Sequence, residues 1–387
     1  NKVNFHYKSL IVKIITCQNC VMDTTDQNII FDENGVCDHC NTYYNDIFPK
    51  WKSKLNNENN LELILDKIRV SGKNKDYDCI IGVSGGIDSS YLTYIAKKKF
   101  KLRPLIFHVD AGWNSQIAVE NIGKLLDHLD LDLFTEVVDW EEVRDLQIAF
   151  LKSGVPHIDV PQDHAFFATM YKYANLHDIN FILTGGNYST ECIRNPKEWM
   201  YFQSDERQLR DIHNKFGSKK LKNYPITSIL WHKFYLPVFK NVKVLRLLDF
   251  VPYNKNNAIR TLQKQIDWVP YNQKHFESRF TRFYEGYWLL NRFGFDTRKV
   301  QFSSLILTNQ MTRGKALELL KKQPLTNDEI KTEKEFVASK LKISISELEN
   351  FFNLPKKTYR DYKNQELLYN FGSKIFRFLN LELGGKR

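Results

Sequence analysis

Long apolar runs are missing from this chain of 387 residues. A membrane-spanning helix needs roughly 20 consecutive, predominantly apolar residues, and no stretch of the sequence approaches that length. The N-terminal part also lacks the apolar core and cleavage site of a secretory signal, because the apolar run at residues 10–12 is far too short. We therefore expect a cytoplasmic protein with no membrane partner.

Cysteine is scarce, and so are blocks of like charge. Six cysteines in a chain of this length exclude a small disulfide-built scaffold. The formal net charge is +11, but lysine and arginine are spread along the chain, so the charge alone does not indicate nucleic acid as a partner. With 42% hydrophobic and 26% charged residues, the composition is that of a globular protein, and the length allows two or three domains.

Apolar segments alternate with amphipathic ones from about residue 77 onward. Predicted strands lie at residues 79–83, 105–109, 133–138 and 181–183, and predicted helices at residues 90–99, 117–129 and 165–176. This alternation predicts an α/β fold, a doubly wound parallel sheet with helices on both faces. Ligands of such sheets bind beyond the carboxyl ends of the strands. After about residue 196 the pattern becomes helical, with two capped helices expected within residues 326–352.

A glycine-rich segment, Ser-Gly-Gly-Ile-Asp-Ser-Ser at residues 84–90, joins the first predicted strand to a helix. Such a junction exposes backbone N–H groups at a helix N-terminus, where the helix dipole adds partial positive charge. Glycine lets the backbone approach a phosphate closely, and serine hydroxyls donate hydrogen bonds to phosphate oxygens. The alternative is a glycine turn that only connects strand and helix. We predict a phosphate-binding loop formed by Ser84, Gly85, Gly86, Ser89 and Ser90.

Asp88 has a different predicted role within this loop. A carboxylate repels phosphate, so we expect Asp88 to hold the Mg²⁺ ion that accompanies a nucleotide. The Walker A pattern is absent from the sequence, which by that criterion excludes a P-loop NTPase. The loop instead resembles the Ser-Gly-Gly-x-Asp-Ser motif of PP-loop ATP pyrophosphatases, the superfamily of asparagine synthetase, NAD synthetase and tRNA-thiolating enzymes. This resemblance implies cleavage of ATP to AMP and pyrophosphate, with adenylation of a substrate oxygen.

Two further strand ends are predicted to line the same nucleotide pocket. His108 and Asp110 lie at the end of the second predicted strand, although Asp110 is equally suited to capping the next helix. Gly185 and Gly186, within Thr-Gly-Gly-Asn at residues 184–187, follow the fourth strand and repeat the strand-to-glycine arrangement. Because the carboxyl ends of parallel strands meet at one edge of a sheet, these residues are expected beside the phosphate-binding loop.

Four of the six cysteines form two Cys-x2-Cys pairs separated by residues 21–36. This separation fits the template of about 15 to 20 residues between pairs for four thiolates around a tetrahedral metal. Four thiolates close the coordination shell, so the expected Zn²⁺ is structural. Two disulfides or an iron–sulfur cluster are the alternatives. The predicted zinc ligands are Cys17, Cys20, Cys37 and Cys40.

The other two cysteines and one histidine are not assigned to the metal. Cys79 lies in a predicted buried strand and is interpreted as a core residue. Cys192 lies close to the expected pocket, but no base is visible beside it in the sequence, so we interpret this thiol as inert. His39 lies inside the second cysteine pair and receives no role.

Residues 274–283 are dense in charged and aromatic side chains. Lys274, Glu277 and Arg282 have helical spacing, which predicts that they face one pocket. Such a set suits anionic phosphates, or the negative charge that develops when a carbonyl oxygen is adenylated. An exposed amphipathic helix held by salt bridges explains the same pattern equally well.

Over nearly its whole length the chain resembles the N-acetyl sugar amidotransferase family, the WbpG/PseA-like proteins of bacterial surface-glycan synthesis. Both cysteine pairs and the phosphate-binding loop take part in the resemblance. The matching segments are residues 17–23, 35–40, 82–90, 109–115, 184–187, 274–278 and 293–313.

The resemblance implies an ATP-dependent amidotransfer for lipopolysaccharide or flagellin glycan synthesis. ATP would activate the carbonyl oxygen of an N-acetyl group on a nucleotide-linked sugar, and ammonia would displace AMP to leave an acetamidino group. The sequence contains no glutaminase signature, so a separate glutaminase (HisH-like) subunit is the expected source of ammonia. Lys274 is expected to stabilise the developing charge, with Glu277 and Arg282 as further catalytic candidates.

The sequence divides into four predicted regions. These are an N-terminal zinc-binding region (1–60), a PP-loop ATPase domain (75–240), a helical substrate and catalytic region (241–325) and a C-terminal helical region (326–387). Two other functions remain open: a tRNA-modifying PP-loop enzyme, thiolating or lysidine-forming, and a zinc-dependent scaffold that binds nucleotide without chemistry. A thiolase would need a cysteine pair beside the nucleotide, and a mere scaffold would not need Asp88.

Overall fold

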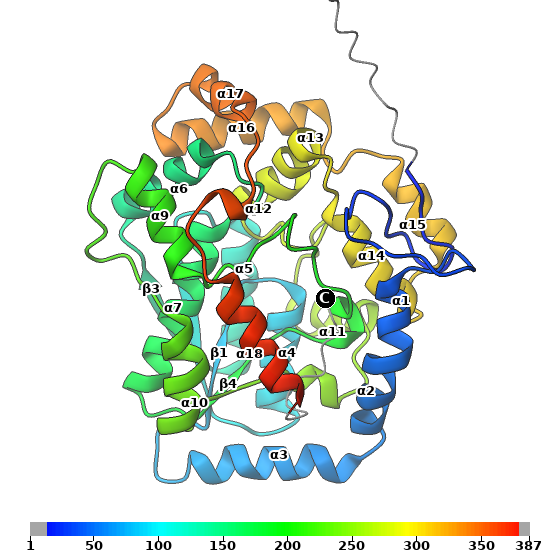
Figure 1. Cartoon of the computed structure of the whole chain (residues 1–387). Helices are drawn as coiled ribbons and strands as arrows, with labels where there is room; N and C mark the ends of the chain where they lie inside the picture. Colours follow the sequence, from blue (N-terminus) through cyan, green and yellow to red (C-terminus); the bar gives the residue numbers. More distant parts are fainter. Residues whose placement is uncertain (1–13, 379–387) are drawn as a thin grey trace, which may run out of the picture.

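The computed structural model describes residues 14–378 (Figure 1). The short apolar run at residues 10–12 lies outside the described residues, as do the ends of the first and last predicted regions. Among residues 14–378, no helix combines the length and the apolar character that crossing a membrane requires.

A parallel five-stranded sheet forms the centre of the molecule, with strand order β3-β2-β1-β4-β5. The order reverses between β1 and β4, so the carboxyl ends of these two strands flank the crevice where doubly wound folds bind ligands. The predicted fold class is thus confirmed, and the four predicted strands are present. The strands are β1 (Cys79–Gly82), β2 (Pro104–Asp110), β3 (Leu133–Val137), β4 (Phe181–Leu183) and β5 (Lys243–Leu245).

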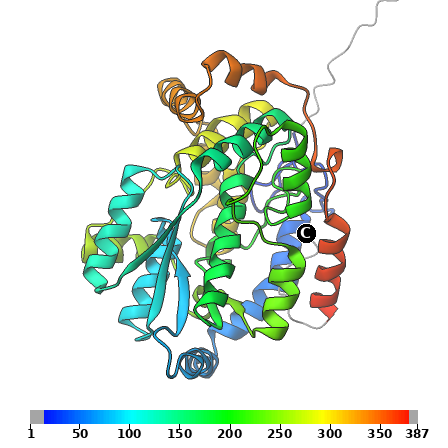
Figure 2. The same ribbon diagram turned by 90° about the vertical axis from the view of Figure 1, so that its left-hand side faces the viewer.

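Helices cover both faces of the sheet, as Figure 2 shows for the cyan and green helices on either side of the strands. Alternate side chains of each strand point to opposite faces. Ile80 and Phe107 therefore pack into one core with α6 and α7, whereas Ile81 and Ile106 pack into another with α4, α5 and α11. The helices around the sheet are α3 (Glu58–Ser71), α4 (Ile87–Lys98), α5 (Gln116–Leu129), α6 (Trp140–Ser153), α7 (Val160–Leu176), α9 (Glu206–Phe216) and α11 (Lys255–Ile266).

The chain is helical on both sides of this layered unit. The N-terminal cysteines lead into α1 (Asp38–Thr42) and α2 (Phe48–Leu55), and two short helices, α8 (Tyr188–Glu191) and α10 (Leu236–Phe239), follow β4. The C-terminal region is helical, as predicted. Its helices are α12 (Arg279–Phe283), α13 (Leu289–Phe293), α14 (Thr297–Leu307), α15 (Arg313–Leu320), α16 (Asn327–Leu341), α17 (Ile345–Asn353) and α18 (Glu366–Phe378).

Local sequence explains where several of these helices begin. The side chains of Thr326 and Ser344 each accept a backbone N–H of the first turn, and Glu329 and Glu347 bond back to the capping residues. These are two reciprocal capping boxes, and they begin the two helices that were predicted within residues 326–352. Asn57 caps α3 by accepting the backbone N–H of Asn60 with its side chain.

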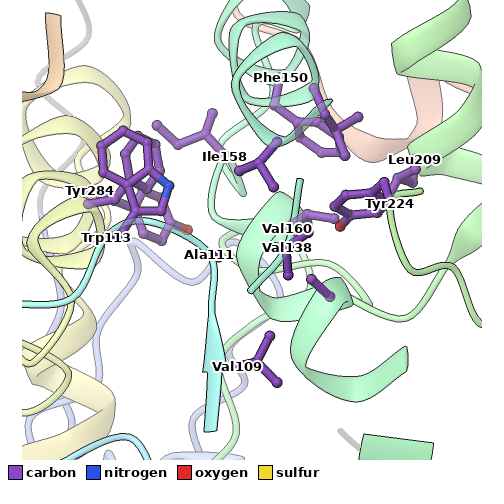
Figure 3. Packing of buried hydrophobic residues seen from close by; sticks show 14 of the residues in the cluster. Val109, Ala111, Trp113, Val138, Phe150, Ile158, Val160, Leu209, Tyr224 and Tyr284 are labelled. Atoms are coloured by element: carbon purple, nitrogen blue, oxygen red, sulfur yellow. The ribbon is translucent and has the colours of Figure 1, made fainter. Parts of the chain in front are cut away.

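One buried core connects the sheet to the C-terminal helices (Figure 3). Trp113, which follows β2, and Tyr284 both belong to this core, and the ring centroid of Trp113 is 4.9 Å from that of Phe280 in α12. Trp113 is 1% exposed, so this packing fixes the loop after β2 against residues 279–284. The core includes residues on both sides of the boundary proposed at residue 240, and the four-region division stays a prediction.

Candidate functional site

The loop after β1 is shaped by a glycine that no other residue replaces without strain. Gly85 has φ of +80°, and a Cβ added there would lie 2.7 Å from the backbone oxygen of Ala118. Both features require glycine. Gly86 then takes the N-cap position of α4, so the loop directs backbone N–H groups and the positive end of a helix dipole toward the crevice.

The loop after β4 packs directly against the loop after β1. A Cβ added to Gly185 would lie 2.9 Å from the backbone nitrogen of Ser89 and 3.2 Å from the Cβ of Asp88. This contact closes the crevice between the two strand ends at which the sheet order reverses. The sequence predicted that these two glycine turns meet at one edge, and the structure brings them into contact.

Lys274 joins the two loops through ion pairs. Its Nζ lies 2.9 Å from Asp88 Oδ2 and 2.5 Å from Glu191 Oε1. The Lys274 and Asp88 side chains are only 11% and 15% exposed. Burial lowers the pKa of Lys274, but the two carboxylates outweigh it and hold that pKa above its ordinary value. Burial likewise raises the pKa of Asp88, and Lys274 and Tyr253 overcome this effect and lower it. Both groups are therefore charged at neutral pH.

Asp88 is fixed on both carboxylate oxygens. Its Oδ1 accepts hydrogen bonds from Tyr253 Oη at 2.5 Å and from Asn187 Nδ2 at 3.4 Å, while Oδ2 faces Lys274. Carboxylate oxygens such as those of Asp88 and Glu191 are the ligands that Mg²⁺ takes. The carboxylate oxygens thus fit the predicted ion. A metal bound to Asp88 would replace one of the hydrogen-bond donors that now contact this carboxylate.

Backbone pairing with the loop after β2 places the segment that carries Lys274. Ser115 N donates to Glu277 O at 2.9 Å, and Arg279 N donates to Trp113 O at 2.8 Å. This pairing brings the Glu277 carboxylate over the phosphate-binding loop, where Ser84 Oγ donates to Glu277 Oε1 at 3.2 Å.

The structure brings most of the predicted site residues into one cavity of about 200 Å³. Residues 274–277 form a turn and not the helix suggested by their spacing, because α12 begins only at Arg279. Arg282 faces away from this cavity and pairs with Glu329 and Glu333. The predicted residues that line the cavity are Ser84, Gly86, Asp88, Ser89, Gly185, Lys274 and Glu277.

The other predicted residues lie around this cavity without lining it. Ser90 is fully buried, and its hydroxyl has no hydrogen-bond partner among the described residues. Asp110 accepts from Gly112 N at 2.7 Å and so stabilises the turn after β2. His108 lines a neighbouring cavity, and its Nδ1 lies 2.8 Å from Val83 O. Gly186 lies near Glu191 and Arg246.

Sequence reasoning missed several polar residues of the cavity site, and three of them lie close to Asp88 and Lys274. Glu191 and Lys255 line the cavity, and Tyr253 bonds to Asp88. Glu191 lies only four residues beyond the Thr-Gly-Gly-Asn motif, at the end of the short helix α8. This short separation in the sequence could have identified Glu191 as a candidate site residue. Tyr253 and Lys255 precede or begin α11, and nothing in their local sequence separates them from other tyrosines and lysines.

The four N-terminal cysteines form a second candidate site, outside the nucleotide crevice. Their Sγ atoms all lie within 4.8 Å of one another, and all four residues are buried. The Sγ–Sγ separations include 3.6 Å between Cys20 and Cys37 and 3.8 Å between Cys17 and Cys40. A Zn–S bond of about 2.3 Å puts two sulfurs of a tetrahedron about 3.8 Å apart, so the arrangement fits a metal ion. These separations are far too long for disulfides.

The cysteine cluster is part of the packed structure. The Arg313 guanidinium donates to the backbone oxygens of Cys17 and Cys20 at 2.7 and 2.9 Å, and the same core includes Val300 of α14. α14 in turn packs against α8, which carries Glu191. A metal that orders this cluster would therefore also support α8.

The two remaining cysteines are buried away from the candidate nucleotide cavity. Burial raises the pKa of the Cys192 thiol to about 12, and burial raises the pKa of Cys79 as well. His39 binds Asp26 with its Nε2 at 2.9 Å, so its nearest polar partner is a carboxylate outside the cysteine cluster.

Comparison with known proteins identifies the C-terminal part of the chain. Residues 277–376 match the family described as "LPS biosynthesis protein WbpG-like, C-terminal domain". We call these matched residues the WbpG-like domain. The resemblance inferred from the sequence is thereby confirmed over this part of the chain. The WbpG-like domain begins at Glu277, in the cavity, and extends through α12 to α18.

An uncharacterized protein of Methanocaldococcus jannaschii is 32% identical to this chain over 120 residues, which are 30% of this chain and 40% of the relative. The chain thus spans about two fifths of the length of this curated relative.

Three solved structures are also similar to this chain. The NH3-dependent NAD synthetase from Campylobacter jejuni is 17% identical over 55% of this chain and 83% of its own, with a TM-score of 0.28. The tRNA thiolase NcsA from Methanococcus maripaludis is 11% identical over 84% and 88%, with a TM-score of 0.36. The NAD+ synthetase from Burkholderia pseudomallei is 15% identical over 57% and 91%, with a TM-score of 0.27. TM-scores this low carry no conclusion about the function of this chain.

Proposed function

We propose that this protein is an ATP-dependent, AMP-forming amidotransferase that converts the N-acetyl group of a nucleotide-linked sugar to an acetamidino group. The observation that carries the proposal is the position of Lys274, whose ammonium pairs with Asp88 of the phosphate-binding loop and with Glu191 beyond β4. A cation held at the junction of these loops is suited to stabilise charge that moves between a phosphate and a substrate oxygen.

Each part of the crevice has a role in this proposal. The backbone N–H groups of the loop after β1, with Ser84 and Ser89, bind the phosphates of ATP. Asp88 would hold Mg²⁺, and the ion would supply positive charge for the leaving pyrophosphate. Lys274 then faces the phosphorus that is attacked. Lys255 lines the same cavity, and its side chain has no ion-pair partner among the described residues, so it is available to bind a phosphate.

The proposed reaction has two steps, adenylation of the amide oxygen and displacement of AMP by ammonia. The amide oxygen of the N-acetyl group attacks the α-phosphorus of ATP, and the bond to pyrophosphate breaks. Ammonia next attacks the acetamido carbon, loses a proton, and displaces AMP, which departs with the former amide oxygen. The sugar keeps an acetamidino group in which nitrogen has replaced oxygen.

The proposal places this reaction in bacterial surface-glycan synthesis and includes a partner. The family description of residues 277–376 refers to lipopolysaccharide biosynthesis, which supports a sugar acceptor. A separate glutaminase subunit would supply ammonia, because the sequence contains no glutaminase signature. We further propose that the four-cysteine site holds structural zinc, since four closely spaced thiolates leave no coordination position for catalysis.

The test is a reaction with purified protein, ATP, Mg²⁺, ammonium and a panel of UDP-linked N-acetyl sugars. The proposal predicts AMP, pyrophosphate and a sugar product that is lighter by the mass difference between O and NH. Asp88→Asn should abolish AMP release and retain the wild-type circular dichroism spectrum. Release of ADP and phosphate would contradict the proposed cleavage of ATP.

The same experiment distinguishes the tRNA-modifying alternative. Adding tRNA in place of the sugar should give no AMP if the proposal holds. Thiolation is disfavoured because the cysteines outside the metal cluster, Cys79 and Cys192, are buried thiols whose pKa values are raised. AMP formation that depends on tRNA and ignores every sugar would replace the proposed function with this alternative.

A further inference from the structure

Two larger cavities open beside the candidate nucleotide cavity. A cavity of about 540 Å³ lies toward residues 190–204 and is called the basic cavity here. A cavity of about 550 Å³ lies over the ends of β1 and β2 and is called the acidic cavity. Glu191 and His275 line both of them and also line the nucleotide cavity. These two residues therefore mark a junction at which the contents of all three cavities would meet.

The basic cavity has the charge that a bound diphosphate requires. Four cationic side chains line it, and Glu191 is the one carboxylate among its described lining residues. Its volume is within the range of pockets that hold small ligands, about 300–1,000 Å³. The cations are Arg194, Lys197, Arg246 and Lys274.

The acidic cavity has the opposite character. Carboxylates from three elements line it, including Asp159 and Asp163 at the start of α7 and Glu285 after α12, and no lysine or arginine is found among its described lining residues. Burial raises the pKa of Asp159 to about 7 and that of Asp163 well above its ordinary value. A second diphosphate would find no lysine or arginine there to bind it, so the two cavities are not interchangeable for an anionic ligand.

Two cations of the basic cavity are held in place by neighbouring side chains. The Arg246 guanidinium lies 4.1 Å from the ring centroid of Tyr188, and its Nε lies 3.1 Å from Asp249 Oδ2. Its buried Nη2 has no hydrogen-bond partner among the described residues. Lys197 donates to Asn370 Oδ1 at 2.7 Å, and its Nζ lies 3.5 Å from Glu366 Oε1, so a bound phosphate would share this ammonium with Glu366.

We propose that the basic cavity binds the nucleoside diphosphate end of the acceptor substrate through Lys197, Arg246 and Arg194. This inference rests on the proposed function, which requires a nucleotide-linked sugar. With the diphosphate on these cations, the sugar extends toward Glu191 and His275, and its N-acetyl group reaches the side of Lys274 that faces the nucleotide cavity.

The test measures binding without turnover. UDP, GDP and CDP are titrated into the full chain by calorimetry, and the tightest-binding one is then compared between wild type, Lys197→Gln and Arg246→Gln. We expect each substitution to weaken its binding about 10-fold or more, because each removes a charge-assisted contact to phosphate. ATP binding with Mg²⁺ should change less than about twofold. Lys264→Gln is the matched control, since Lys264 is an exposed lysine that lines none of the three cavities.

Three results would overturn the inference: no nucleoside diphosphate binds the wild type, binding is unchanged in both variants, or ATP binding falls as much as diphosphate binding. The last result would assign the basic cavity to ATP. Melting temperatures of the variants guard against unfolding as a cause. Because diphosphate binding needs no amidation, a protein that binds UDP through Lys197 but makes no acetamidino product would contradict the proposed function and leave this inference standing.

Discussion

Three charged side chains at the crevice act as one group. Lys274 lies between Asp88 and Glu191, so removing it would leave two carboxylates close together, one of them, Asp88, largely buried. Such a loss is costly, because an unpaired charge keeps its desolvation penalty without the compensating attraction. A phosphate that binds Lys274, or a Mg²⁺ ion that binds Asp88, must therefore displace one of the ion pairs among these three side chains.

Replacing Lys274 is the most direct residue-level test of its role. We expect Lys274→Met to lower the rate of AMP formation about 100- to 1,000-fold, the usual loss when a preorganised charge-stabilising group is removed. Single-turnover AMP release measures the effect, and Lys264→Met controls for the loss of a positive charge. Urea unfolding of both variants shows whether the loss is one of chemistry or of folding. An unchanged rate would remove Lys274 from the proposed reaction.

The ion pair between His275 and Glu285 should make the stability of the protein depend on pH. Burial lowers the pKa of the His275 imidazole, but Glu285 Oε1 at 3.1 Å outweighs that effect and holds the pKa at about 9. The folded state thus binds the proton more tightly than the unfolded state, whose histidine has a pKa of about 6.5. The stabilisation is complete below about pH 6.5 and is lost as the pH rises through about 9.

A matched variant isolates this contribution of His275. Its backbone has φ of +67°, a conformation that asparagine tolerates better than most residues. The difference in the free energy of unfolding between wild type and His275→Asn should therefore shrink between pH 6.5 and pH 10. Urea titrations across that range measure it, and a difference that is independent of pH would show that the ion pair with Glu285 is not formed.

At the scale of elements, the site depends on two glycine turns that touch. Gly185→Ala would place a Cβ 2.9 Å from Ser89 N, so one of the loops must move. We expect AMP formation to fall about 10-fold or more, because displacements below 1 Å already misalign reacting groups. Gly123→Ala in α5 is the control: a Cβ there meets nothing within 4 Å and should stabilise the helix by about 0.5–1 kcal/mol. Full activity of Gly185→Ala would show that loop contact is not needed.

The cysteine cluster links the N-terminal segment to α14 and, through it, to α8. Metal removal by a strong chelator should lower the melting temperature by several degrees, because metal binding contributes folding free energy. Cys37→Ser should lose the metal and show the same loss, whereas Cys192→Ser should retain it. Mass spectrometry of the native protein should find one zinc per chain. A metal-free protein that melts as the loaded one does would contradict the structural role, and iron would contradict zinc.

Elements set by local pattern were predictable, and those set by tertiary contacts were not. The buried strands β1, β2 and β4 are continuous apolar runs, and the capping boxes at Thr326 and Ser344 are local signals. β5 was missed because it has three residues, two of them exposed. Residues 274–277 were expected to continue a helix, but their conformation is set by backbone pairing with the loop after β2.

At the scale of the whole molecule, the sheet order places two glycine turns on either side of one crevice. The sequence predicted the phosphate-binding side of this crevice from motifs that lie within a few residues of one another. Glu191, Tyr253 and Lys255 were beyond that reasoning, because only folding brings them to Asp88 and Lys274 from other parts of the chain. The same is true of Arg282, whose partners lie on α16.

The molecule's positive net charge is distributed unevenly around this crevice. The overall charge is +11, yet carboxylates line the acidic cavity, while cations line the basic cavity on the other side of Glu191 and His275. The amino-acid composition indicates only the net charge. The separation of charge that distinguishes the two cavities is a property of the fold.

The path of a single oxygen atom tests the central claim most directly. A UDP-linked N-acetyl sugar that carries a heavy isotope of oxygen in its acetamido carbonyl is incubated with the protein, ATP, Mg²⁺ and ammonium, and the AMP is analysed by mass spectrometry. The account predicts that AMP gains the heavy oxygen in proportion to the acetamidino sugar formed. AMP that contains only ordinary oxygen, or ATP cleavage that is independent of the sugar, would contradict it.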